Sequence, residues 1–91
     1  GINMFLEDTP EVLSQMLEAI TRKDLKAVER AAHRIKGAAA NLEARDLANI
    51  AFEIEQAAGE GKISDADVAR LQKSMDELKI TLQTLMQSIA A

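Results

Sequence analysis

Residues 24–42 read DLKAVERAAHRIKGAAANL and decide the fold class. Apolar side chains recur in this stretch at alternating intervals of three and four residues: Leu25, Val28, Ala32, Ile35, Ala39 and Leu42. Such a period is typical of one face of an α-helix, whereas a half-buried strand alternates at every second residue. Asp24 is a suitable N-cap, because its carboxylate can accept hydrogen bonds from free backbone N–H groups of the first turn. The stretch therefore predicts an amphipathic helix over residues 24–41.

Three more segments carry the same period, and we expect helices near residues 9–21, 45–58 and 65–90. Thr9 and Pro10 are typical of an N-cap followed by a proline at the first helical position. Ser64 and Asp67 fit a capping box at the start of the last helix. The apolar residues before Thr9 predict, at most, a short extra N-terminal helix that covers one end of the fold.

The composition favours an all-α fold. The chain of 91 residues has only four glycines, one proline and 2% aromatic residues, which does not fit a β architecture rich in turns. Each predicted helix has one apolar stripe, and the connections between the helices are short. Four such helices bury their stripes best as an antiparallel up-down four-helix bundle. We expect residues 1–91 to form a single domain.

Several classes of protein are excluded by what the sequence lacks. It has no cysteine, which rules out disulfides and thiolate metal sites, and its single histidine rules out a two-histidine zinc site. No apolar run approaches the roughly 18 residues that a membrane span needs, and nothing resembles a signal peptide. We therefore expect a soluble, cytoplasmic domain that makes no membrane contact.

The charge of the chain is unevenly distributed. The net charge of −4 argues against binding to nucleic acid. Residues 22–40 nevertheless hold six basic and two acidic side chains, a net charge of +4, whereas the remainder of the chain carries −8. A basic segment on an acidic molecule can steer an acidic partner toward one face.

His33, the only histidine, lies on the face of its predicted helix opposite the apolar stripe and is expected to face solvent. Lys36, Gly37 and Ala40 lie on the same side, three, four and seven residues further on. An exposed histidine is most often an ordinary surface residue. Gly37, however, stands among alanines in mid-helix, where glycine costs about 1 kcal/mol relative to alanine. A bulky group on the imidazole or a closely docking partner would explain the missing side chain, with close helix packing as the alternative.

Residues 33–37 read HRIKG, which resembles the H-x-x-K-G signature of histidine phosphotransfer domains. The continuation AAANL over residues 38–42, and the third predicted helix as far as Glu55, are similar to that family too. The resemblance implies that His33 is a phospho-acceptor through Nε2, that Lys36 holds the phosphoryl group and that Gly37 leaves room for it. Glu55 matches the position that accepts a hydrogen bond from Nδ1–H of the imidazole. A proton fixed on Nδ1 would leave the lone pair of Nε2 free to attack phosphorus.

The family usually has a glycine where this sequence has Glu43. We expect that glycine to serve the turn after the second helix, where a positive φ is convenient. Asn41 is the nearby residue that best tolerates such a conformation, so the sequence predicts the left-handed residue there.

The resemblance further implies a phosphorelay intermediate of two-component signalling, whose partners are response-regulator receiver domains with an acceptor aspartate and bound Mg²⁺. Such a domain is a monomeric carrier, with no ATP site and no cofactor of its own, rather than an autonomous enzyme. The chain begins with Gly1 instead of methionine, which suggests a piece of a larger signalling protein or a trimmed chain. The sequence does not distinguish a free-standing protein from the tail of a hybrid sensor kinase. The residues predicted to contact the partner surround His33: Lys26, Arg30, Arg34, Ala40 and Phe52. Phe52 points away from its own apolar stripe, so packing on the N-terminal segment is an alternative role for it.

Three other functions remain open. A dimerisation and phospho-acceptor domain of a sensor kinase usually has an acidic residue after its histidine and a proline nearby, but here Arg34 follows His33 and no proline follows Pro10. A helical interaction module would carry His33 incidentally. A metal- or cofactor-binding bundle needs Glu-x-x-His pairs that face inward, and the chain has none.

Overall fold

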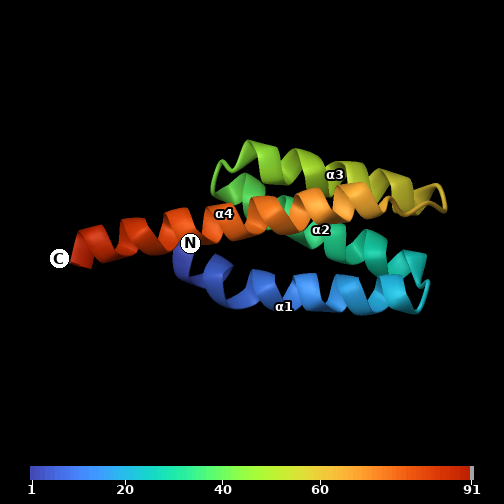
Figure 1. The fold of residues 1–91 in the computed structure, drawn as a ribbon, viewed down its shortest axis with the longest axis horizontal. Coiled ribbons are helices and arrows are strands. Elements are labelled where there is room, and N and C mark those ends of the chain that lie inside the picture. Colours follow the sequence, from blue (N-terminus) through green and yellow to red (C-terminus); the bar gives the residue numbers. More distant parts are fainter. Residues whose placement is uncertain (91) are drawn as a thin grey trace.

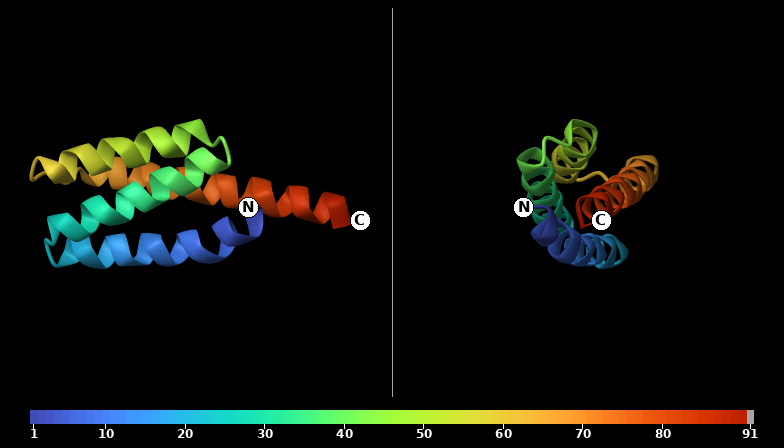
Figure 2. Two further views of the ribbon diagram at one scale, coloured as in Figure 1. Left: turned by 180° about the vertical axis from the view of Figure 1, so that it is seen from behind. Right: turned by 90° about the vertical axis from the view of Figure 1, so that its left-hand side faces the viewer.

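Four helices make up the protein in a computed structural model that describes residues 1–90 (Figure 1). They are α1 (Ile2–Thr21), α2 (Leu25–Asn41), α3 (Arg45–Gly59) and α4 (Asp65–Ala90). Successive helices run in opposite directions around a common core, and no strand occurs in the described part of the chain (Figures 1 and 2). The predicted all-α, antiparallel four-helix bundle is confirmed. Ala91, the last residue of the predicted domain, lies outside the described residues.

The core includes Val28, Ala32, Ile35 and Ala39 of the predicted α2 stripe, and α2 and α3 together supply it with five alanines. The fully or nearly fully buried alanines of these two helices are Ala31, Ala32, Ala39, Ala51 and Ala58. Because an alanine side chain is short, the two backbones can approach closely while Ile35 and Ile54 fill the remaining space. At one end of the seam the side chain of Glu29 extends from α2 to α3, because a Cβ added to Gly59 would lie 2.7 Å from its Oε2. Side chains of one helix, such as Glu29 and Glu55, can therefore reach the other.

The first helix begins earlier than the sequence predicts. The prediction of an N-cap at Thr9 is wrong, because α1 starts at Ile2, with Pro10 inside the helix and Thr9 buried. No separate N-terminal helix forms; the first turns belong to α1 and bend away from the axis of its remainder (Figure 1). Proline removes one backbone hydrogen bond and kinks a helix rather than always ending it. Burial of Phe5 in the core, which contributes roughly 1.5–3 kcal/mol, offsets that loss.

All three loops end their helices in the same way. Each loop contains one residue with a positive φ, and the backbone N–H of the next residue donates to the carbonyl five residues before it. These hydrogen bonds run from Asp24 to Ala19, from Ala44 to Ala39 and from Lys62 to Ala57. This is the Schellman arrangement, which requires one left-handed residue per loop. Those residues are Lys23 (φ 59°), Glu43 (φ 57°) and Gly61 (φ 82°).

The prediction that Asn41 would take the left-handed conformation is therefore wrong. Asn41 is the last residue of α2, and Glu43 itself occupies the left-handed position, where the resemblance led us to expect glycine. The hydrogen-bonding pattern fixes which residue must have φ > 0, whatever side chain it carries. The predicted caps at the next helix starts are confirmed for Asp24, which accepts from the backbone N–H of Ala27, and for Ser64, which accepts from that of Asp67.

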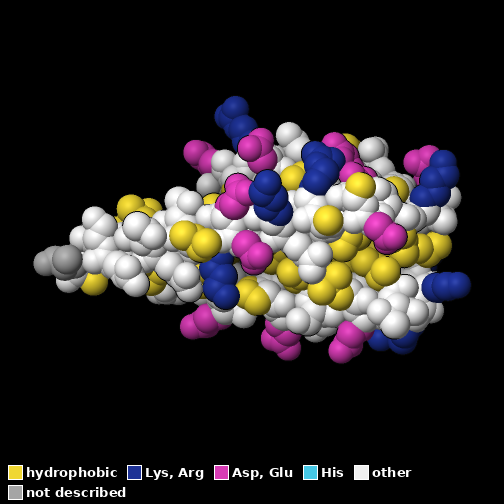
Figure 3. Space-filling view, viewed as in Figure 1, with side chains coloured by type: hydrophobic (Ala, Val, Ile, Leu, Met, Phe, Trp, Pro, Cys, Tyr) yellow, Lys and Arg dark blue, Asp and Glu magenta, His cyan; other side chains and the backbone are white. Residues whose placement is uncertain are grey.

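The C-terminal turns of α4 project beyond the other three helices, which gives the molecule a length of 47 Å against 20 and 19 Å in the other directions (Figures 1 and 2). Residues 80–90 carry no charged side chain. Figure 3 shows the projecting end without acidic or basic groups, and it shows hydrophobic side chains along the boundary of α4 with α1. No histidine is visible on this face, because His33 lies on α2, which is behind α4 in this view.

Replacing Glu43 with glycine should stabilise the fold by about 0.5–1 kcal/mol, because glycine adopts φ > 0 without steric cost. Glu60→Gly is the matched control: it removes the same charge next to a helix end, but Glu60 has φ −96°, so glycine should bring no gain there. Urea denaturation of both variants measures the difference. Equal stability of the two variants would show that Glu43 is not strained.

Candidate functional site

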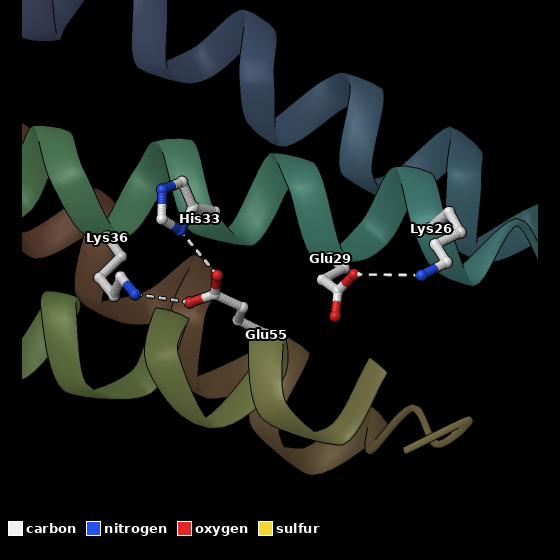
Figure 4. A network of polar contacts seen from close by, with 5 residues as sticks. All are labelled: Lys26, Glu29, His33, Lys36 and Glu55. Carbon is white, nitrogen blue, oxygen red and sulfur yellow. Dashed lines mark hydrogen bonds and ion pairs between the residues drawn. The ribbon is translucent and has the colours of Figure 1, made fainter. Parts of the chain in front are cut away.

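The side chains predicted to carry chemistry meet where α2 faces α3. His33 and Lys36 project from α2, one turn apart, and Glu55 projects toward them from α3 (Figure 4). The exposed fraction of the side chain falls from 66% for His33 to 30% for Lys36 and 19% for Glu55. The imidazole thus stands in solvent above a carboxylate that is largely shielded by the two helices.

The carboxylate of Glu55 bridges the other two side chains. Its Oε2 lies 2.7 Å from Nδ1 of His33, and its Oε1 accepts a hydrogen bond of 2.7 Å from Nζ of Lys36 (Figure 4). An ionised carboxylate can only accept hydrogen bonds, so the proton of a neutral imidazole must lie on Nδ1. Nε2 then keeps its lone pair, which makes it the nucleophilic atom of the exposed ring.

The bridge also sets the charge of Glu55. Burial raises the pKa of this carboxyl, but the hydrogen bonds from Lys36 and His33, together with their positive charge, outweigh burial and hold the pKa below its ordinary value. The carboxylate is therefore ionised at neutral pH. The ionised Glu55 stabilises the fold fully above the ordinary pKa of a glutamate. This stabilisation is lost as the pH falls through the lowered pKa of Glu55.

Gly37 leaves an open space one turn beyond His33. A Cβ added at this position would meet no atom within 4 Å, and the residue is exposed. Close packing between helices therefore does not require this glycine, which removes the alternative considered from the sequence. The open space adjoins the surface on which the imidazole stands.

The family comparison agrees with this geometry. The model of the Hpt domain family matches residues 2–87. The chain belongs to the Hpt domain family. The same comparisons found no match among curated proteins and none among solved structures.

Membership of the Hpt family gives the chain a phosphotransfer role in two-component signalling. Hpt domains carry phosphoryl groups rather than catalyse reactions at a catalytic site of their own, and they interact with response-regulator receiver domains. The family therefore favours a phosphotransfer role over an interaction module in which the histidine is incidental. Within residues 1–90, no helix is both long and apolar enough to cross a membrane, and no three acidic, His or Cys side chains gather as a metal site would need.

The remaining predicted residues of the Hpt domain lie around this bridge in different ways. Arg30, Arg34 and Ala40 are exposed on α2. Lys26 is exposed as well, but it lies nearer the N-terminus of α2, where its Nζ is 3.9 Å from Oε1 of Glu29 (Figure 4). Phe52 is 43% exposed, and its ring contacts the ammonium group of Lys36, which the sequence did not reveal.

Replacing Glu55 with alanine should slow phosphorylation of His33 about tenfold without abolishing it, since a charge-assisted hydrogen bond contributes roughly 1.5 kcal/mol or more. The nucleophile remains, but its orientation and tautomer are no longer fixed. Nitrogen-15 NMR of the imidazole should show a weaker preference for the Nδ1–H tautomer in Glu55→Ala. Glu53→Ala is the control, because Glu53 lies on the same helix but pairs with Arg70. Identical tautomer ratios in Glu55→Ala and the wild type would remove Glu55 from the mechanism.

Replacing Gly37 with glutamine should leave the bundle folded and slightly more helical, because glycine is a poor helix former, yet it should impair phosphoryl transfer. Gly37→Ala is the graded control: it adds only a Cβ to the open space and should slow transfer less than glutamine does. Circular dichroism checks the fold, and transfer of labelled phosphate checks the function. Normal transfer in Gly37→Gln would show that the space has no role.

Proposed function

We propose that the protein is a phosphorelay intermediate in which His33 accepts a phosphoryl group from one receiver-domain aspartate and donates it to another. One observation supports this most: the carboxylate of Glu55 accepts a hydrogen bond from Nδ1 of His33 and another from Nζ of Lys36, each with a length of 2.7 Å. It leaves Nε2 as the free nitrogen of an imidazole whose side chain is 66% exposed. A free and accessible Nε2 is what attack on a large partner's aspartyl phosphate needs.

The transfer is an in-line displacement at phosphorus. The lone pair of Nε2 forms the N–P bond as the P–O bond to the aspartate breaks, and the aspartate leaves as a carboxylate. The proton stays on Nδ1, so the ring becomes positively charged, and the carboxylate of Glu55 stabilises that charge. Lys36 can neutralise the phosphoryl oxygens, and the space at Gly37 accommodates them. The reverse reaction uses the same groups.

The proposed docking surface surrounds His33. Lys26, Arg30 and Arg34 are exposed and basic, and Ala40 and Phe52 add a small and a large apolar contact. Positive charge on this face would speed encounter with an acidic receiver and would make the rate depend on salt. The Mg²⁺ that assists the transfer belongs to the receiver, so we propose that this domain holds no cofactor of its own. We further propose a cytoplasmic monomer, free or joined to a hybrid sensor kinase.

The test is to mix the protein with a phosphorylated receiver and follow the label. His33→Gln should take up no acid-labile phosphate and should remain folded, because an exposed side chain contributes little to stability. Lys36→Ala should still accept phosphate, but more slowly, since charge neutralisation is lost while the nucleophile remains. Lys73→Ala, which removes an exposed lysine of α4, is the matched control and should behave as wild type. Label on His33→Gln would contradict the proposal.

A further inference from the structure

The ring of Phe52 lies beneath the ammonium group of Lys36. Nζ of Lys36 is 5.1 Å from the centroid of the ring, within the distance at which a cation is attracted to an aromatic face. The protein has one other aromatic residue, Phe5, which is buried in the core, whereas Phe52 is 43% exposed. The exposed phenylalanine is thus next to the one lysine that belongs to the site.

The position of Phe52 on α3 explains the contact. Phe52 precedes Glu55 by three residues, so both side chains leave the same side of the helix and face α2. Lys36 reaches across from α2 and contacts both: a hydrogen bond to Oε1 of Glu55 and the face of the ring. A long, flexible side chain is in this way confined at two points.

The two contacts of Lys36, with Glu55 and with the ring of Phe52, respond differently to phosphorylation of His33. A phosphoryl group on Nε2 of His33 brings between one and two negative charges and competes with Glu55 for the ammonium group. The aromatic ring is neutral and accepts no conventional hydrogen bond, so it attracts the ammonium group without competing for its three N–H donors. The ring can therefore keep hold of Lys36 while those donors turn from Glu55 toward the phosphoryl oxygens.

We propose that Phe52 is a positioning residue that holds the ammonium group of Lys36 between Glu55 and the phosphoryl group on His33. This inference rests on the proposed function, because it gives Phe52 a part in the step that Lys36 assists. It differs from a role as a receiver contact alone, since it acts within this chain and does not need the receiver.

The experiment compares two replacements of Phe52 with a small phosphodonor and with a receiver. Phe52→Leu keeps an apolar side chain and removes the aromatic face, whereas Phe52→Tyr keeps the face. Ile80→Ala is the control, because Ile80 is an exposed apolar residue (64%) on α4, outside the site. Phosphoramidate, which needs no docking surface, serves as the small phosphodonor.

With phosphoramidate, Phe52→Leu should accept phosphate about two- to fivefold more slowly than the wild type, the range that an exposed cation–π contact implies. Phe52→Tyr should restore the wild-type rate, and Ile80→Ala should leave it unchanged. In a Lys36→Met background, Phe52→Leu should have no further effect, because the lysine through which the ring acts is gone. A Phe52→Leu variant that is slowed only with the receiver would overturn the inference and leave Phe52 as a partner contact.

NMR of the unphosphorylated protein provides a second measurement that involves no transfer. The ε-methylene protons of Lys36 should be shifted upfield by the ring in the wild type and in Phe52→Tyr, and should return to ordinary values in Phe52→Leu. Identical Lys36 shifts in all three proteins would overturn the inference.

A wild type that takes up no phosphate from any donor would overturn the proposed function first, whereas equal phosphoramidate rates in wild type and Phe52→Leu would overturn this inference alone.

Discussion

The carboxylate of Glu55 is the group on which the site depends. It reaches from α3 to α2 and accepts from Nδ1 of His33 and from Nζ of Lys36, each at 2.7 Å. Its low exposure strengthens both interactions, and their charge in turn keeps it ionised by lowering its pKa. Without this acceptor, the tautomer of the imidazole would not be fixed, and Lys36 would keep only its contact with the ring of Phe52.

The bridge is possible because of how α2 and α3 pack. Three alanines of these helices, Ala32, Ala39 and Ala51, are completely buried, and such small side chains allow the two backbones to lie close enough for one glutamate to span the seam. Larger residues there would move Glu55 away from both partners. The core thus sets the geometry, while His33 itself remains in solvent, where a partner can reach it. Gly37 is tolerated for a related reason: the glycine lowers the stability of the helix, but it lies outside the core, so it leaves the packing of α2 against α3 unchanged.

The sequence predicted what depends on local pattern and missed what depends on packing or on backbone geometry. The bounds of α2, α3 and α4 followed from their apolar period and caps, and the exposure of His33 followed from its place opposite the stripe. The start of α1 was missed, because Pro10 is a strong local signal that burial of Phe5 overrides. The left-handed Glu43 was missed because residue preference pointed to Asn41, and the contact of Phe52 with Lys36 joins two helices whose relative rotation no single period reveals.

The proposed function depends most directly on one atom: because Glu55 occupies Nδ1, we propose that Nε2 of His33 carries the phosphoryl group. Since His33 is the only histidine, nitrogen-15 labelling of histidine gives a spectrum of this ring alone. The protein would be phosphorylated with phosphoramidate, and the coupling between phosphorus-31 and nitrogen-15 would identify the bonded nitrogen. We expect a phosphorus coupling to Nε2, with the proton retained on Nδ1. A phosphorus coupling to Nδ1 would contradict this proposal.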